Sequence, residues 1–145
     1  QNMYDHSVRV PFMVVGPGIA KGATNEAPIY LQDVIPTTLE WAGLETPEHV
    51  QFESIQPHLD GNGKERTAIY GAYLDKQRSI TSGGYKLIIY PNAETLRLYH
   101  VKKDPHELVD LLADENAEAK AKADELFAKF LKVRRAYGDT LKIKL

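Results

Sequence analysis

A continuously apolar stretch near the start of the chain predicts a buried strand. Within Val8–Val15, the four residues Phe12–Val15 are all apolar, as expected for a strand that is covered on both faces. Gly16–Gly18, which contains a central proline, ends the stretch. A single buried strand cannot form a sheet, so we expect its partner strands to lie outside residues 1–60.

A helix pattern follows over Asp33–Ala42. Apolar residues recur on one face of it, at Ile35, Leu39 and Ala42. We expect Asp33 to cap the N-terminal amides, and Pro36 falls in the first turn, where a missing N–H costs little. Gly43 suits the position just after the last turn. A strand, a loop and a helix in this order predict half of an α/β unit.

The second part of the chain has a different pattern. Short β-prone runs separated by turn residues predict an antiparallel meander of four strands, at Ala68–Leu74, Arg78–Thr81, Tyr85–Tyr90 and Leu96–His100. A long helix is predicted from about Glu115 to Tyr137. Its apolar residues fall at spacings of three and four, at Ala119, Ala123, Leu126, Phe130, Val133 and Tyr137. This stripe is expected to pack on the meander, because an open sheet needs a cover.

Composition narrows the class of protein. The chain has 145 residues, 18 Lys and Arg against 20 Asp and Glu, and no cysteine. The lack of cysteine excludes disulfides, Cys-based zinc sites and a Cys nucleophile. The longest apolar run is too short to cross a bilayer, and no basic stripe points to nucleic acid. A polar loop at Asp60–Arg66 suggests two parts, residues 1–62 and 63–145.

Few residues are candidates for catalysis or for binding a ligand. The adjacent Asp5 and His6 could bind a metal, move a proton or hold an anionic substrate, or they could simply belong to a solvated loop. Arg9, Arg78 and Lys86 are candidate anion contacts; an internal ion pair is an equal alternative for Arg9, and a solvated position for Arg78. Neither a Gly-x-Ser-x-Gly motif nor His residues at metal-ligand spacing occur, so the sequence contains no complete active site.

The order of several motifs resembles the C-terminal third of the type I sulfatases, members of the alkaline-phosphatase-like superfamily. The motifs are Tyr4–Phe12 with Gly16–Gly18, Asp33–Leu39 with Ala42–Leu44, Tyr85–Ile88, and Leu98–Glu107. They match the family's Tyr-Glu-x-x-x-Arg-Val-Pro…Pro-Gly, Asp-x-x-Pro-Thr, Tyr-Lys and Leu-Tyr-Asp-Leu-x-x-Asp-Pro-x-Glu segments in that order. Two positions depart from the pattern, because the family Glu is Asp5 here and the family Asp after Leu-Tyr is His100.

The resemblance implies an α/β fold class, with an α+β arrangement in this segment. Residues 1–62 would end the large α/β catalytic domain. Residues 63–145 would form a small four-stranded antiparallel sheet packed on a C-terminal helix. Such enzymes hydrolyse sulfate esters with a formylglycine nucleophile and one calcium ion, both of which would lie upstream, as would a sulfate-contacting Lys just before Gln1. The segment alone is therefore expected to contain no catalytic and no metal-binding residue and to be inactive.

The resemblance also implies what this segment would contact. Asp5, His6 and Arg78 are the candidates for binding the non-sulfate part of a sulfated small molecule or carbohydrate. The N-terminal part of the same chain would be its partner, with no nucleic acid and no membrane, and a bacterial parent would be periplasmic or extracellular. Two alternatives stay open: a piece of a related phosphomonoester or phosphonate hydrolase, and a standalone binding or interaction module.

Overall fold

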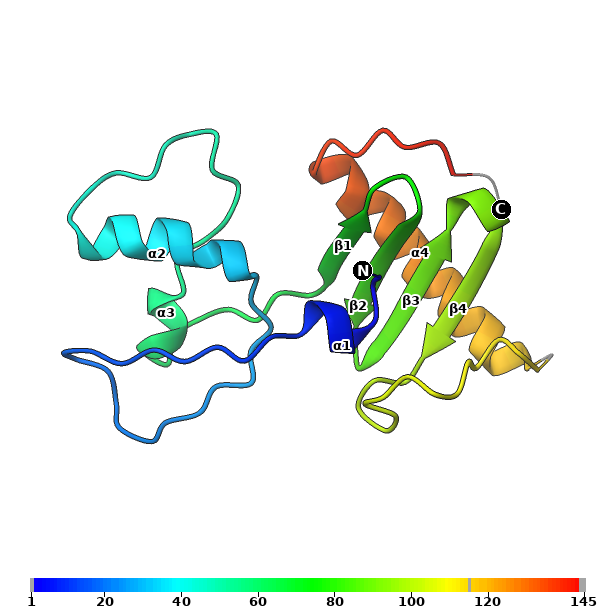
Figure 1. Ribbon diagram of the computed structural model, residues 1–145, viewed down its shortest axis with the longest axis horizontal. Helices are drawn as coiled ribbons and strands as arrows, with labels where there is room; N and C mark the ends of the chain where they lie inside the picture. The colour runs from blue at the N-terminus through cyan, green and yellow to red at the C-terminus, as the bar shows by residue number, and fades with distance from the viewer. Residues whose placement is uncertain (1, 115, 144–145) are drawn as a thin grey trace. The chain divides into compact units, whose positions relative to one another are not determined.

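The computed structural model describes residues 2–114 and 116–143, and its elements are shown in Figure 1. The chain divides into two compact units. The sheet unit comprises the segment up to Pro11 together with the chain from Thr67 onward, and the α2 unit comprises Phe12–Arg66. Among the described residues, no helix has both the length and the apolar character needed to cross a membrane. The sequence pattern places a boundary between residues 62 and 63, where a large catalytic domain would end and a small domain begin. This domain boundary stays a prediction.

The sheet unit is built on an antiparallel meander, as the sequence predicts. Its strands pair in chain order and are β1 (Ile69–Tyr73), β2 (Gln77–Ser82), β3 (Tyr85–Tyr90) and β4 (Thr95–Tyr99). Gly83 and Gly84 join β2 to β3 with φ values of 59° and 82°. Two successive positive φ values suit the tight hairpin turns that match the twist of the strands, and glycine adopts them without steric cost. The 3₁₀ turn η2 (Pro91–Ala93) leads into β4.

One face of this sheet is covered by α4 (Ala117–Ala136). Asn116 caps the helix, because its side chain accepts hydrogen bonds from the backbone N–H groups of Glu118 and Ala119 at 2.9 and 3.2 Å. The helix ends before Gly138, whose φ of 68° is the left-handed conformation expected after a C-terminal turn. The predicted long helix is therefore confirmed, although its predicted start at Glu115 lies outside the described residues.

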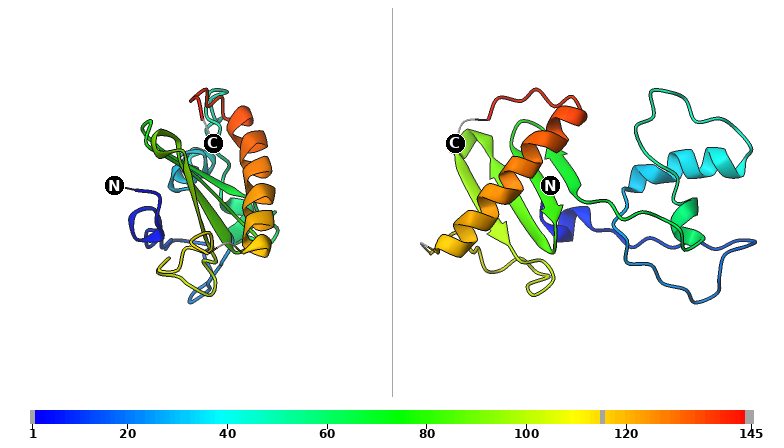
Figure 2. Two further views of the ribbon diagram at one scale, coloured as in Figure 1. Left: turned by 90° about the vertical axis from the view of Figure 1, so that its right-hand side faces the viewer. Right: turned by 180° about the vertical axis from the view of Figure 1, so that it is seen from behind.

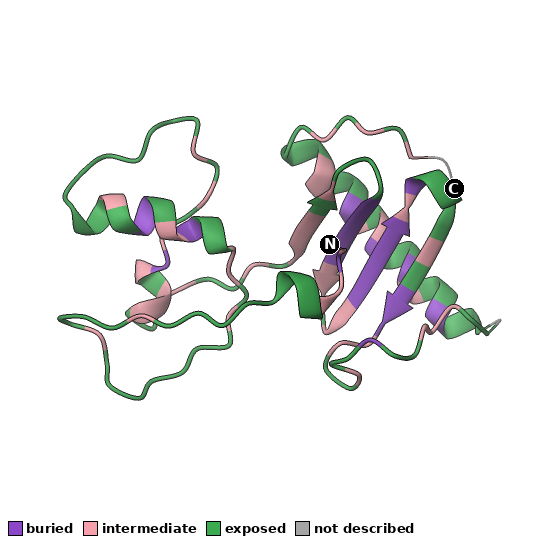
Figure 3. Cartoon of the chain, in the orientation of Figure 1, coloured by how far each residue is buried: buried purple, intermediate pink, exposed green. Residues whose placement is uncertain are grey.

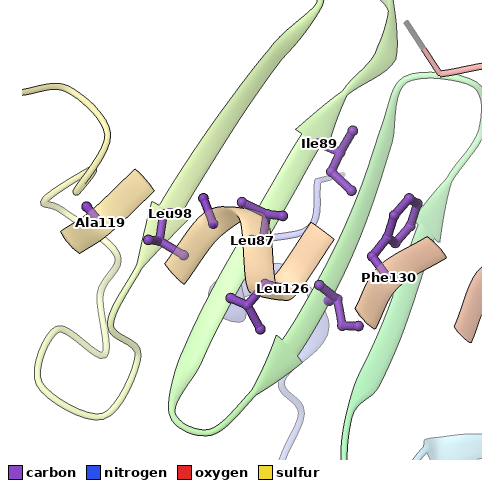
Figure 4. Packing of buried hydrophobic residues seen from close by; sticks show 8 residues of the cluster. Leu87, Ile89, Leu98, Ala119, Leu126 and Phe130 are labelled. Carbon is purple, nitrogen blue, oxygen red and sulfur yellow. The ribbon is translucent and has the colours of Figure 1, made fainter. Parts of the chain in front are cut away.

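The main core lies between the sheet and α4 (Figure 4). It consists of Ile80, Leu87, Ile89 and Leu98 from the strands and Ala119, Ala123, Leu126 and Phe130 from the helix. Alternate strand residues face the helix, and the helical residues recur every three to four positions, so the period of each element presents one apolar surface to the other. Figure 3 shows this buried layer running through the strands and the inner side of α4. Toward the helix end the stripe becomes exposed, since Tyr137 is 39% accessible.

The other face of the sheet holds the N-terminal segment and the one-turn helix α1 (Asp5–Val8). Met3, Ile88 and Tyr99 form a second buried cluster there. The Met3 backbone N–H donates a 3.0 Å hydrogen bond to Gln77 Oε1 on β2. In the left view of Figure 2 the strands are seen nearly edge-on, between α4 on one side and this blue segment on the other. The start of the chain is thus part of the sheet unit.

The strand predicted over Val8–Val15 is wrong for this chain. Val8 closes α1, and residues 9–15 are irregular with no ladder partner. The side chains of Met13 and Val15 are 85% and 89% exposed. A strand is defined by hydrogen bonds to a neighbour, and no strand of the described residues pairs with this apolar segment.

In the α2 unit the predicted helix is confirmed, but its predicted packing is not. The elements of this unit are η1 (Leu31–Asp33), α2 (Val34–Trp41) and α3 (Gln56–Leu59). Pro36 and Thr37 are the buried residues of α2, whereas Ile35 and Trp41 are each 52% exposed. The apolar side of this helix therefore has no cover among the described residues of the unit.

A buried carboxylate organises the α2 unit. Asp33 does not cap α2, contrary to the sequence prediction. Its side chain instead accepts hydrogen bonds from the backbone N–H groups of Tyr30 at 2.7 Å and Glu53 at 3.3 Å, and from Arg66 Nη2 at 2.9 Å. The Arg66 guanidinium also lies 2.8 Å from the second carboxylate oxygen. A buried carboxylate needs such partners, and here they join three distant segments of the unit.

Candidate functional site

A polar pocket of the sheet unit lies between α1 and the turn that follows β4. Its volume is about 330 Å³, and it is lined by Asp5, His6, Arg9, Pro105, His106 and Glu107. Two segments about a hundred residues apart in sequence therefore meet here, and we call this cavity the α1 pocket. Asp5 and His6, which the sequence singled out, are both present in it.

One wall of the α1 pocket is a rigid turn. The side chain of Asp104 accepts a 2.9 Å hydrogen bond from the Val109 backbone N–H, and the Glu107 N–H donates to the Asp104 carbonyl at 3.1 Å. The hydrogen bond from Val109 holds the pKa of Asp104 below its usual value. Glu107 has a φ of 55°, which is unfavourable for a side chain with a Cβ. A residue held in this conformation needs support from the surrounding structure.

That support comes from a buried ion-paired network. Lys86 on β3 has a side chain that is 3% exposed, and its ammonium forms an ion pair with Asp5. The same Nζ lies 2.8 Å from Glu107 Oε1, an ion pair without an aligned hydrogen bond. Glu107 Oε2 accepts a 2.5 Å hydrogen bond from the Asp5 backbone N–H. Lys86 thus joins both walls of the α1 pocket to the sheet, and it compensates one of their two negative charges.

A tyrosine cluster fixes the residue before Asp5. The Tyr4 hydroxyl lies 3.1 Å from the hydroxyls of Tyr90 and Tyr99, and Arg97 Nη1 donates to it at 3.4 Å. Burial, followed by the hydrogen bond with Tyr4, raises the pKa of Tyr99 to about 12. Burial alone would also raise the pKa of Tyr4, but its hydrogen bonds and the Arg97 charge lower it. His6 stacks on the Tyr4 ring at 5.8 Å, so the cluster also orients a pocket residue.

Arg78, the third predicted site residue, is not in the α1 pocket. It is buried, and its Nε and Nη2 donate to the two carboxylate oxygens of Asp139 at 2.9 and 3.2 Å. Its Nη1 donates to the carbonyls of Leu74 and Gln77 at 2.6 and 2.9 Å. This network ties the segment after α4 to β2 and to the turn that joins β1 to β2. A substrate contact by Arg78 stays a prediction, while its guanidinium nitrogens all bind groups of the sheet unit.

Sequence reasoning missed two features of the α1 pocket. Lys86 was considered only as an anion contact, and no role was given to Glu107. The available signals were the lysine inside an otherwise apolar strand and the Asp104-Pro105 pair that begins a tight turn. Neither signal shows that the turn returns to the N-terminal segment, because that contact spans 102 positions.

The described residues do not fit a metal centre. Across residues 2–114 and 116–143, no three His, Cys, Asp or Glu side chains gather closely enough to hold a metal ion. The sequence also contains no cysteine. The carboxylates of the α1 pocket are bound to Lys86, so their oxygens already have a cation.

The comparison with known protein families identifies the family of this chain. The model of the family "N-sulphoglucosamine sulphohydrolase, C-terminal" matches residues 1–136, nearly the whole chain. The chain belongs to this family. The resemblance to sulfatases proposed from the sequence motifs is therefore confirmed, as is the predicted small sheet with its C-terminal helix.

Curated relatives of this sulfatase C-terminal domain are themselves sulfatases. The chain is 29% identical over 151 residues to an N-acetylglucosamine-6-O-sulfatase of Bacteroides thetaiotaomicron, covering 94% of the chain and 27% of the relative. It is 32% identical over 124 residues to a choline-sulfatase of Rhizobium meliloti, covering 76% of the chain and 22% of the relative. The chain thus spans about a quarter of the length of the curated relatives it matches.

Solved structures show the same fold. A protein crystallised with D-glucosamine-2-N,6-O-disulfate, described as its substrate, matches with a TM-score of 0.66 and 29% identity, over 74% of this chain and 24% of that one. A phosphonate monoester hydrolase from Silicibacter pomeroyi matches with a TM-score of 0.72 and 20% identity, over 84% of this chain and 28% of that one. The second likeness concerns the fold alone.

Proposed function

We propose that this chain is the C-terminal portion of a sulfatase that hydrolyses sulfate esters, and that the α1 pocket lies beside its substrate. The observation that carries the proposal is the family match over residues 1–136, together with curated relatives that are sulfatases. The α1 pocket is the part of the sheet unit in which charged and imidazole groups from two distant segments converge.

In this proposal the reacting groups come from the rest of the protein. A formylglycine nucleophile and one calcium ion would supply attack on sulfur and polarisation of the sulfate. The sequence contains neither a cysteine nor a Ser-x-Pro-x-Arg motif from which formylglycine could be made, and the described residues contain no group of metal ligands. The contribution of this chain is to bind and orient: α1 and the turn at Asp104–Glu107 form a wall held rigidly by Lys86.

Asp5 and His6 are the proposed contacts to the part of the substrate that is not cleaved. One carboxylate oxygen of Asp5 binds Lys86, and the Asp5 side chain is still 22% exposed, so it can accept a hydrogen bond from a hydroxyl. His6 is exposed beside it and stacks on Tyr4. We keep Arg78 as a weaker candidate, because its nitrogens bind Asp139 and backbone carbonyls.

The proposed partner of the α2 unit is the N-terminal part of the same protein. An apolar hollow of about 240 Å³ lies in this unit between the segment Phe12–Val15 and α2. Trp41 and Ile55 contribute to its lining, and Trp41 is half exposed. Exposed apolar surface that is gathered in one place is typical of an interface. Pairing of residues 10–15 with strands of the preceding chain would cover it.

The test uses the full-length protein encoded with this sequence and the 145-residue chain as its matched comparison. The full-length protein is expected to release sulfate from 4-nitrophenyl sulfate in the presence of calcium, and the isolated chain to release none. Turnover by the isolated chain would contradict the assignment of the reacting groups to the preceding residues. Cell fractionation of a bacterial host tests the proposed periplasmic or extracellular location.

A phosphonate or phosphomonoester hydrolase is the second candidate, favoured by the structural likeness to the Silicibacter pomeroyi enzyme. The two activities are separated by paired substrates with the same leaving group. A sulfatase hydrolyses 4-nitrophenyl sulfate faster than 4-nitrophenyl phosphate and 4-nitrophenyl phenylphosphonate. The reverse order would replace the proposed function with the second candidate.

A further inference from the structure

The hydrogen-bonding capacity of the α1 pocket is distributed unevenly between acceptors and donors. Both carboxylates have partners within the sheet unit: Asp5 binds Lys86, and Glu107 binds Lys86 and the Asp5 N–H. The Glu107 side chain is 1% exposed, so a ligand has little access to it. The acidic groups of the pocket are therefore used mainly to build it.

The hydrogen-bond donors of the pocket, in contrast, have few partners within the sheet unit. Among the described residues, the side chains of Arg9 and His106 make no hydrogen bond or ion pair, and both are exposed. Within the part of the chain that the structure describes, the His6 ring has one hydrogen bond, between its Nε2 and Asn2 Nδ2 at 3.3 Å, which leaves the other ring nitrogen free. An arginine offers five N–H donors in a planar fork that matches sulfate or carboxylate oxygens. The unused capacity of this pocket is thus that of a donor site.

The charges agree with this assignment. Lys86 pairs with both carboxylates, and Arg9, which forms no ion pair with them, brings the number of positive charges to two. The formal charge of the pocket is then zero with neutral imidazoles, and each protonated histidine adds one positive charge. An anion would meet the guanidinium and the two rings at the surface, whereas the negative charges lie beneath it against a buried ammonium.

We propose that Arg9, His6 and His106 form a recognition site for a second anionic group on the substrate, next to the sulfate that is cleaved. The inference rests on the proposed function. It assigns the chain a role in specificity: the protein prefers a sugar sulfate that carries another sulfate or a carboxylate over one with neutral substituents. Arg9 provides the fork, and the imidazoles add donors from either wall.

The test measures binding to the full-length protein by calorimetry, so that it does not depend on turnover. Glucosamine 2-N,6-O-disulfate carries a second sulfate, glucuronate 2-sulfate carries a carboxylate, and glucose 6-sulfate and glucose 2-sulfate are the references without a second anion. The wild type is expected to bind at least one of the two dianionic sugars about tenfold more tightly than its reference, and the stronger of them identifies the anion.

Arg9→Gln and His106→Gln are expected to remove most of this preference while binding of the references changes less than twofold. Lys103→Gln is the matched control, because it removes an exposed positive charge close in sequence to His106 but outside the pocket lining. Thermal unfolding of each variant identifies any that fails to fold, and His6→Gln then provides an independent test of the same site.

The outcomes separate the inference from the proposed function. A preference that is absent in the wild type, or equally large in the Arg9 and His106 variants, overturns the recognition site even if the protein hydrolyses aryl sulfates. A preference that these variants abolish supports the site even if no sulfatase activity is found, and in that case only the proposed function fails.

Discussion

The two units of the chain use buried groups in different ways. In the sheet unit, apolar side chains from four strands and α4 fill a common core that includes Phe130 and Leu87, both with no exposed surface. In the α2 unit, Ile55 is the one buried large aliphatic side chain among the described residues, and the buried Asp33 with Arg66 organises the segments. Apolar burial is the dominant favourable term in folding, so the sheet unit has the stronger basis for independent stability.

The difference indicates which surface the proposed N-terminal partner would cover. The α2 unit exposes Phe12, Met13, Val15, Ile35 and Trp41, although their patterns along the sequence are those of buried strands and helices. In the sheet unit, by contrast, the core-facing residues of β2, β3, β4 and α4 are buried within the unit. A sequence pattern of burial without burial in the structure indicates a surface that is covered by residues outside the chain, in agreement with the proposed N-terminal partner.

The largest expected loss of stability distinguishes the core of the sheet unit from the exposed helix of the α2 unit. Phe130→Ala removes a fully buried ring from the sheet unit and should lower the free energy of unfolding by about 4 kcal/mol. Trp41→Ala is the comparison, because Trp41 is 52% exposed, and it should cost less than about 1 kcal/mol in the isolated chain. Urea unfolding followed by circular dichroism measures both. Equal losses for the two variants would mean that the contrast between the units is wrong.

The next effect concerns the buried lysine. Lys86→Met leaves two carboxylates without their cation and should destabilise the sheet unit by about 3 kcal/mol. The triple variant Lys86→Met, Asp5→Asn, Glu107→Gln removes the uncompensated charges and should recover a substantial part of the loss. Equilibrium unfolding of the single and triple variants gives the result. No recovery would show that Lys86 contributes by packing rather than by charge.

A smaller and more local effect is expected in the α2 unit. Asp33→Asn keeps the shape of the side chain but removes the charge that Arg66 binds, and should cost roughly 2 kcal/mol. Hydrogen exchange should rise at the backbone amides of Tyr30 and Glu53 and stay unchanged in β3. Faster exchange in β3 as well would show that the two units unfold together.

The stability of the sheet unit should depend on pH through the Arg78–Asp139 ion pair. Hydrogen bonds from Arg78, opposed by burial, keep the pKa of Asp139 well below its usual value. A lowered carboxyl pKa stabilises the fold above the unfolded value, near pH 4, and this stability is lost as the pH falls toward the folded value. Unfolding between pH 7 and pH 2 should therefore show a steeper loss for the wild type than for Asp139→Asn. Parallel curves would exclude the Arg78–Asp139 pair as the cause.

The smallest effect is at the end of α4. Gly138 has a φ of 68°, and a Cβ there would meet no neighbouring atom within 4 Å. Gly138→Ala should therefore cost about 1 kcal/mol through backbone conformation alone. Gly16→Ala, at a glycine with no positive φ, is the control and should change stability by less than about 0.5 kcal/mol. A change in the midpoint of thermal unfolding checks both substitutions.

Much of the sheet unit is predictable from local pattern, and the reason is physical. The strands β1–β4 follow each other with short turns, and α4 comes after a longer connection, so alternation, glycine turns and a helical stripe are sufficient to place them. The segment Val8–Val15 has an equally clear strand pattern, but pairing depends on neighbours that the chain does not supply. Asp33 illustrates the same limit, since its binding to Arg66 depends on a segment 33 positions away.

The candidate site is less predictable than the fold. Asp5 and His6 are recognisable as a reactive pair, but the α1 pocket depends on Lys86 and Glu107 meeting them from distant parts of the chain. Arg78 shows the opposite error: an arginine beside a turn looks available in the sequence, yet Asp139 returns from the end of the chain to bind it. Long-range ion pairs decide both cases, and local patterns contain no information about them.

Hydrogen–deuterium exchange of the 145-residue chain and of the full-length protein tests the central claim most directly. If the chain is the C-terminal portion of a sulfatase, the strands β2 and β3 are protected in both samples. Residues 10–15 and α2 then gain protection only in the full-length protein. Equal protection of residues 10–15 and α2 in the two samples would contradict the account, because the exposed apolar surface would then have no partner in the preceding chain.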